Sequence, residues 1–72
     1  MNKAELVAAI KDGTTELFSQ SERIQYTIVC DCDGWKADGT EVQSGLDGGF
    51  YTAETLEELA GYLEQIGDLE VA

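Results

Sequence analysis

Residues 24–32 read IQYTIVCDC and alternate between apolar and polar side chains more clearly than any other part of the chain. The even positions, from Ile24 to Cys32, carry aliphatic, aromatic or cysteine side chains, and most odd positions are polar. Because successive side chains of a strand point to opposite faces, this pattern predicts a strand with one apolar face. Such a strand is typical of an antiparallel sheet that keeps one face in water.

Turn signals follow the strand at Asp33-Gly34, Asp38-Gly39 and Asp47-Gly48-Gly49. An Asp-Gly pair between strands favours a hairpin, since glycine tolerates the positive φ of tight turns. We therefore expect a second strand over about Thr40–Leu46 and a short third strand over Gly49–Tyr51.

Helices are predicted on both sides of these strands. The first begins after Asn2, which forms a capping box with Glu5, and ends near Asp12-Gly13. The last helix is expected over residues 53–66, with Thr52 as its N-cap and Gly67 after its end. Its helical spacing places a set of apolar side chains in one stripe: Leu56, Leu59, Ala60, Leu63 and Ile66.

Two other segments are less defined. Residues 14–19 fit either a second short helix or an extended piece, because Leu17 and Phe18 continue the register of the first helix but Gly13 interrupts it. Residues 69–71 could add a short strand at one edge of the sheet.

The order of these elements predicts an α+β fold for the 72 residues, which we interpret as a single domain, 1–72. Two amphipathic helices and one amphipathic sheet can bury their apolar faces only against each other. We expect a two-layer sandwich in which both helices pack on one face of a small antiparallel sheet of three to four strands.

Charge is distributed very unevenly along the chain. The formal net charge is −11, and no Lys, Arg or His follows Lys36, whereas nine carboxylates do. Soluble domains usually intersperse both signs, because a field of one sign destabilises the compact state. This imbalance favours a cationic binding partner, although acidity that serves solubility alone also fits.

The predicted partner-binding residues form two acidic groups and one aromatic position. One group lies opposite the apolar stripe of the last helix, and the other projects from the polar face of the sheet and its turns. Glu64 and Asp68 lie where a base would stabilise the helix end, which favours binding over simple solvation. Trp35 fits either a core side chain or an exposed anchor. The residues are Glu54, Glu57, Glu58, Glu64, Asp31, Asp33, Asp38, Glu41 and Trp35.

Catalytic, metal and cofactor sites find little support. The chain has no His to act as a base, and Cys30-x-Cys32 lacks the further ligands of a zinc site. We interpret both thiols as small buried side chains on the apolar face of their strand. The segment from Asp31 to Val42 does not match a calcium-binding loop, since Trp35 and Lys36 occupy two of its essential positions. We expect no enzyme activity, no metal and no cofactor.

A membrane location is not expected. The chain has no apolar run of about twenty residues, its first residues lack the pattern of a signal peptide, and anionic lipid would repel it. These features predict a cytoplasmic protein, in the bacterial host cytosol if a phage encodes it. We also expect no direct binding to nucleic acid.

In size, acidity and compactness, the chain resembles the small acidic inhibitors that bacteriophages encode against CRISPR and restriction systems, some of which mimic DNA. The resemblance rests on composition and carries over no residue motif. It implies an inhibitor that occupies the basic nucleic-acid-binding groove of a partner enzyme or complex. The alternatives are an antitoxin-like or other acidic regulatory protein, or acidity that serves solubility in a halophile.

Overall fold

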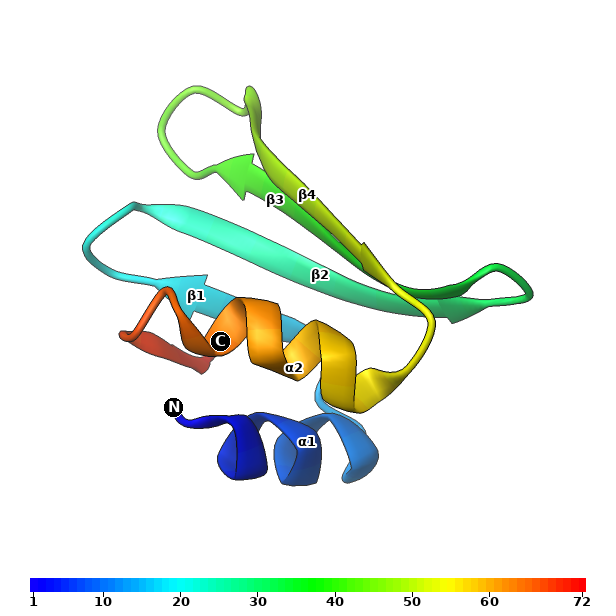
Figure 1. The fold of residues 1–72 in the computed structure, drawn as a ribbon. Coiled ribbons are helices and arrows are strands. Elements are labelled where there is room, and N and C mark those ends of the chain that lie inside the picture. The colour runs from blue at the N-terminus through cyan, green and yellow to red at the C-terminus, as the bar shows by residue number, and fades with distance from the viewer.

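Five antiparallel strands form one sheet, and two helices lie on one of its faces (Figure 1). The computed structural model describes residues 1–72. The strands lie side by side in the order β4-β3-β2-β1-β5. The elements are α1 (Lys3–Lys11), β1 (Glu16–Ser19), β2 (Ile24–Asp31), β3 (Gly34–Glu41), β4 (Asp47–Ala53), α2 (Leu56–Glu64) and β5 (Leu69–Val71).

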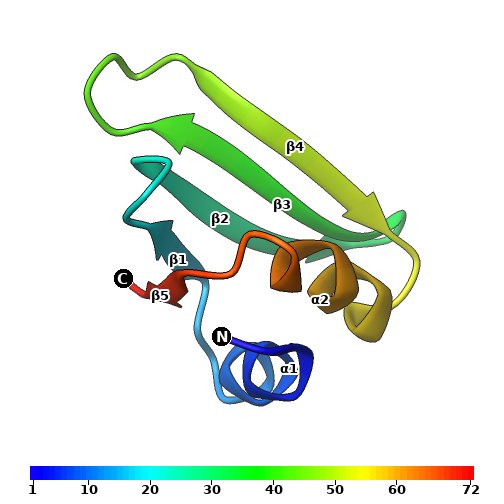
Figure 2. The same ribbon diagram turned by 60° about the vertical axis from the view of Figure 1, so that its left-hand side comes forward.

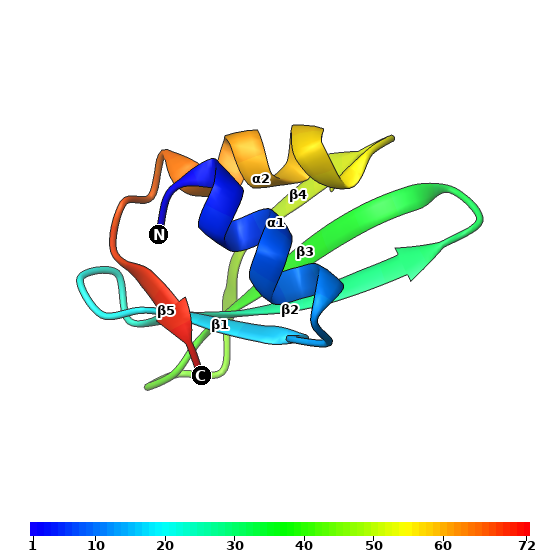
Figure 3. The same ribbon diagram turned by 90° about the horizontal axis from the view of Figure 1, so that it is seen from below.

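The predicted α+β class and the packing of both helices on one face are confirmed, but the sheet has five strands rather than three to four. Figure 3 views the sheet along its edge and places both helices on the same side. The ambiguous segment 14–19 contributes β1, which lies between β2 and β5. β5 forms the short edge strand that the sequence allowed.

The boundaries of β3 and β4 differ from the prediction. β3 runs from Gly34 to Glu41, so Asp38-Gly39 lies inside a strand and is not a turn. A side chain at Gly39 would come within 2.9 Å of the Tyr26 ring. Glycine is therefore required here because β3 passes closely over Tyr26, and not because the chain turns.

Helix α1 begins as predicted, with the reciprocal capping box between Asn2 and Glu5. Helix α2 begins three residues later than predicted, because the Thr55 hydroxyl accepts the Glu58 N–H and caps the helix. Thr52 and Ala53 instead pair with β3. The predicted apolar stripe is confirmed from Leu56 to Leu63.

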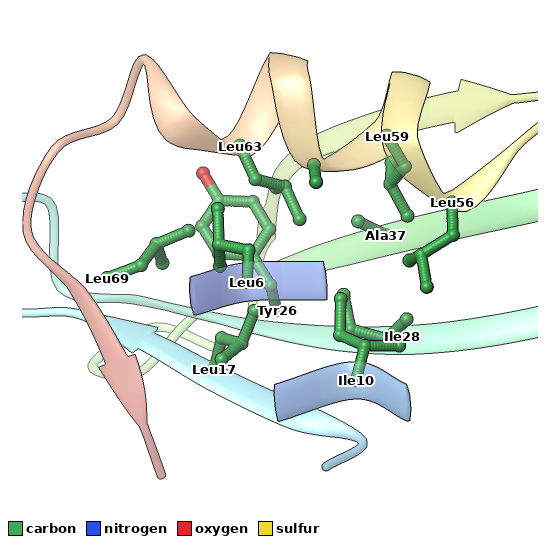
Figure 4. Close-up of a cluster of buried hydrophobic side chains, with 11 residues drawn as sticks. Leu6, Ile10, Leu17, Tyr26, Ile28, Ala37, Leu56, Leu59, Leu63 and Leu69 are labelled. Carbon is green, nitrogen blue, oxygen red and sulfur yellow. The ribbon is translucent and has the colours of Figure 1, made fainter. Parts of the chain in front are cut away.

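The core lies between the helices and the face of the sheet that they cover, which we call the covered face (Figure 4). Tyr26 and Leu17 reach it from the strands, and Leu6, Leu59 and Leu63 reach it from the helices. Trp35 is partly buried and packs against this core. The opposite face, which we call the open face, carries no helix, as Figure 2 shows from a second angle.

No helix combines the length and the apolar character needed to cross a bilayer.

Candidate partner-binding surfaces

Glu64 and Asp68, which looked like carboxylates without a structural reason, both have internal partners. The Glu64 carboxylate accepts the backbone N–H of Lys3 at 2.6 Å, at the positive end of the α1 dipole. Asp68 accepts the Ser19 hydroxyl at 2.8 Å and the Ser21 N–H at 2.7 Å, so it joins β5 to the β1–β2 turn. These hydrogen bonds hold the pKa of Asp68 below its usual range. The premise of the sequence argument, that Glu64 and Asp68 have no structural role, was therefore wrong.

The tip of the β2–β3 hairpin carries the predicted residues Asp31 and Asp33. The Lys36 ammonium lies 2.8 Å from the Asp31 carboxylate and 3.9 Å from that of Asp33. The hydrogen bond from Lys36, followed by that from the Asp33 N–H, lowers the pKa of Asp31, and Asp31 in turn raises the pKa of Lys36. The last base of the chain is therefore neutralised locally.

The start of α2 lies at the same end of the molecule as this hairpin tip (Figure 1). Trp35 pairs with Ala53, and a side chain at Gly34 would come within 3.3 Å of the Glu54 Cα. The structure thus gathers six predicted residues from three segments at one end of the molecule. They are Asp31, Asp33, Trp35, Glu54, Glu57 and Glu58.

These carboxylates have partial structural explanations. The Glu58 carboxylate accepts the N–H of Glu54 at 3.2 Å, and Glu57 and Glu58 lie in the first turn of α2, where the helix dipole favours negative charge. The predicted helix included Glu54, but this residue lies in the segment that connects β4 to α2.

Glu41 does not join this group. It lies at the opposite end of β3 from the hairpin tip, about 23 Å away at roughly 3.3 Å per residue. It pairs with Ile24, which packs against the core, so its side chain lies on the same side of the sheet as the covered face. The prediction that Glu41 shares the polar face with Asp31 was wrong, because the pairing of β3 with β2 places odd-numbered residues of β3, such as Ala37, on the covered face.

Asp38 lies on the open face, in the middle of β3. The register aligns Glu16, Thr27, Asp38 and Phe50 across four strands, so these side chains share one face. Two strand spacings separate Glu16 from Asp38, which is roughly 10 Å. Asp38 thus lies within the sheet and not in a turn as predicted.

Glu70 joins the same face from the edge of the sheet. It pairs with Phe18, two residues along β1 from Glu16. The side-chain carboxylates of Glu16, Asp38 and Glu70 accept no hydrogen bond and form no ion pair within the protein. We call these three the open-face carboxylates. Their neighbour Phe50 is 56% exposed.

Sequence reasoning missed Glu16 and Glu70 as site residues. A strand assignment for residues 14–19 would have placed Glu16 and Phe18 on one face by alternation. Nothing local, however, links Glu70 to Phe18, because their pairing spans 52 positions of the chain.

Three tyrosines, one each from β2, β4 and α2, lie close together across β3 on the covered side. The Tyr51 ring lies 6.0 Å from Tyr26 and 6.4 Å from Tyr62, measured between centroids. The Tyr26 hydroxyl donates to the Glu22 carboxylate at 3.2 Å, and burial followed by the charge of Glu22 raises the pKa of this phenol. The buried Tyr26 side chain therefore has a hydrogen-bond partner for its hydroxyl group.

Both cysteines are free and exposed, which corrects the prediction that they are buried. Cys30 has the parity of the covered face, but it lies at the end of β2, beyond the buried Ile28, and Cys32 lies in the hairpin turn. No cluster of three or more potential metal ligands occurs in the chain.

Comparison of the chain with protein-family models, curated proteins and solved structures finds no match.

Proposed function

We propose that this protein is a non-catalytic inhibitor that docks the open face of its sheet onto a cationic groove of a nucleic-acid-binding protein. The supporting observation is that the open-face carboxylates have no partner within the protein and share the one face of the sheet that no helix covers. Other acids, such as Glu64 and Asp68, bind backbone or side-chain donors and help to hold the fold. Glu16, Asp38 and Glu70 have no such role, and their mutual repulsion is not compensated.

A groove that binds phosphates suits these side chains. The same Lys and Arg side chains bind phosphate and carboxylate oxygens, and Arg does so through two parallel hydrogen bonds. The sheet holds Glu16 and Asp38 roughly 10 Å apart, two strand spacings, so it presents these anions at a fixed spacing. Such a surface competes with a nucleic acid backbone without imitating any base sequence.

Apolar side chains on the same face favour contact with a protein. Phe50 and Val29 are 56% and 46% exposed, and both lie between polar residues on the open face. Aromatic side chains are enriched at the buried centres of protein interfaces. Carboxylates that share a face with exposed apolar side chains fit a protein groove better than they fit free cations.

The acidic end of the molecule, around Asp31, Asp33 and Glu54, forms a second contact in this proposal. It lies at the end of the hairpin whose outer surface carries Asp38. In this arrangement, Trp35 supports the core behind the acidic end and does not itself contact the partner. The acidic outer surface of α2 lies on the other layer and faces away from the partner.

The test compares two charge reversals of equal size at different places. One variant combines Asp38→Lys with Glu70→Lys on the open face, and the matched control combines Asp12→Lys with Glu57→Lys in the helix layer, outside both proposed contacts. None of these four side chains makes a hydrogen bond within the protein. The measurement is binding to a panel of purified CRISPR effectors and restriction nucleases, and competition with their DNA, at several salt concentrations.

We expect the open-face variant to weaken binding and DNA competition at least tenfold, and the control to weaken them by a smaller factor. Affinity of the unmodified protein should fall steeply as salt rises, because the contact is electrostatic. Equal losses in both variants, or affinity that does not respond to salt, would refute docking through the open face. If no member of the panel binds, inhibition of these two enzyme classes is refuted.

A further inference from the structure

The two edges of the sheet differ in how their backbone groups are used. The register fixes which residues of β4 bond to β3 and which face outward, because hydrogen-bonded and non-bonded pairs alternate along an antiparallel ladder. β4 is an edge strand, with β3 as its only neighbour. Its outward groups are therefore without a partner strand.

Three backbone hydrogen bonds fix this alternation. The Ile28 N–H donates to the Thr15 carbonyl, on the side of β1. The backbone N–H and C=O groups of Thr27 and Val29 therefore point toward β3. The backbone N–H and C=O groups of their partners, Asp38 and Lys36, must then point toward β2. The Val42 N–H donates to Arg23, and the Glu41 N–H donates to Leu46 in the β4 direction, as the same alternation requires.

It follows that Phe50 and Thr52, the partners of Asp38 and Lys36, turn their N–H and C=O groups away from the sheet. Gly49, Tyr51 and Ala53 make the bonds to β3. The free edge of β4 thus presents two donors and two acceptors in regular alternation. Beyond Thr52 the regular edge ends, because the Glu54 N–H is bound to the Glu58 carboxylate.

The edge of β5 is less available. The Ala72 N–H donates to the Glu16 carbonyl, so the backbone groups of Glu70 point toward β1. Within β5, only the backbone groups of Leu69 and Val71 point outward. The Met1 amino group already donates to the Leu69 carbonyl at 3.3 Å. β5 is also only three residues long. An added strand could therefore pair with more residues at the edge of β4 than at the edge of β5.

Charge decides which strand fits there. Asp47 begins β4, Glu54 follows its end, and Asp38 lies beside Phe50 on the open face. The nearest base, Lys36, is engaged by Asp31. A second copy of this chain would also carry a net charge of −11 and acids at the ends of its β4, so it would be repelled from this edge. Free edges commonly carry a lysine or proline that prevents pairing, but β4 has neither.

We infer that the edge of β4 accepts an extended, basic segment of the partner as a sixth strand. This inference rests on the proposed function, since it specifies how the cationic partner binds. Main-chain hydrogen bonds to Phe50 and Thr52 supply affinity, and alternate side chains supply specificity. Cationic side chains of the added strand lie over the open face near Asp38, and apolar ones lie beside Tyr51.

The test uses an end-blocked octapeptide of alternating Lys and Val as the probe, and the same peptide with Glu in place of Lys as its control. Amide hydrogen exchange of the ¹⁵N-labelled protein is followed by NMR with and without peptide. We expect the Lys peptide to protect the amides of Phe50 and Thr52 at least tenfold and to leave that of Val71 unchanged. The Glu peptide should protect none of them.

Two variants place the effect at one edge. Thr52→Pro removes an outward donor of β4, and Val71→Pro removes an outward donor of β5 as the matched control. Proline is tolerated at such edge positions, because no ladder bond is lost. We expect Thr52→Pro to weaken binding of the Lys peptide at least tenfold and Val71→Pro less than twofold. If Thr52→Pro fails to fold, a synthetic chain N-methylated at the Thr52 amide takes its place.

The outcomes separate the two proposals. Binding of the Lys peptide that depends on Asp38 and Glu70, but does not protect the β4 amides, refutes strand addition and leaves docking through the open face standing. Equal binding of the Lys and Glu peptides refutes the cationic partner itself. Protection of Phe50 and Thr52 by a rise in protein concentration alone would show that a second copy occupies the edge, and it would overturn the inference.

Discussion

The covered and open faces of the sheet are built from alternate residues of the same strands, yet they use charge in different ways. On the helix side, apolar side chains fill the core, and carboxylates such as Glu64 and Asp68 tie neighbouring elements together. On the open face, Glu16, Asp38 and Glu70 tie nothing together. The contrast teaches that total acidity does not separate the carboxylates that hold the fold together from those that have no partner within it.

Truncation of one side chain in the core and one on the open face should give the largest difference in unfolding free energy between the two faces. Leu59 is fully buried on α2, so Leu59→Ala should cost about 2–5 kcal/mol of unfolding free energy through lost packing. Phe50→Ala on the open face should change it by only about 0.5 kcal/mol. Urea unfolding checks both values, and a similar cost at the two sites would contradict the division into a packed and an open face.

Adding one methyl group to each of two glycines should reveal the packing density of the covered side. Gly39→Ala should destabilise the protein by roughly 1–3 kcal/mol, since the new Cβ would lie 2.9 Å from the Tyr26 ring. Gly61→Ala, in α2 with no atom within 4 Å of its Cβ, should stabilise the protein by about 0.5–1 kcal/mol. Thermal unfolding measures both, and effects of the same sign would refute the close passage of β3 over Tyr26.

Two glutamates of α2 test whether internal partners distinguish the acids. Glu64→Gln weakens the charge-assisted contact with the Lys3 N–H and should cost about 0.5–1 kcal/mol. Glu57→Gln, which loses no hydrogen bond, should cost less. Chemical unfolding of the two variants at low salt is the measurement. A larger loss for Glu57→Gln would mean that position in the helix, and not the contact, controls the effect.

Acid should weaken the link between β5 and the β1–β2 turn. Because its hydrogen bonds lower the pKa of Asp68 in the folded state, ionised Asp68 stabilises the fold above the unfolded pKa of about 3.9. This contribution is lost as pH falls below about 4 and through the folded pKa. Asp68→Asn should therefore lower the melting temperature at pH 7 and reduce its dependence on pH between 5 and 2.5. Parallel curves for the two proteins would exclude this role.

Much of the architecture could be predicted because its signals are local. The alternation of residues 24–32 identified β2, the capping box identified the start of α1, and the apolar stripe identified α2. The error in the bounds of β3 came from a glycine with two possible meanings. Gly34 has a φ of +118° and does follow a turn, whereas Gly39 has no positive φ and is required only by contact with Tyr26.

The candidate surface was only partly predictable. Asp38 was selected from the sequence, but Glu16 and Glu70 were not, and the exposed position of the two cysteines was missed. Each of these depends on where strands end and which strands lie side by side. Hydrogen bonds between distant segments, such as those from Ser19 and Ser21 to Asp68, leave no trace in a local pattern.

The sequence alone determined the α+β class, the amphipathic helices and the base-free second half, because periodicity, caps and composition are properties of neighbouring residues. The tertiary structure decided which carboxylates are held by internal donors, which face remains open, and which strand edge stays unpaired. These features arise from pairing and packing between segments far apart in the chain, where small shifts of register change which side chains and backbone groups meet.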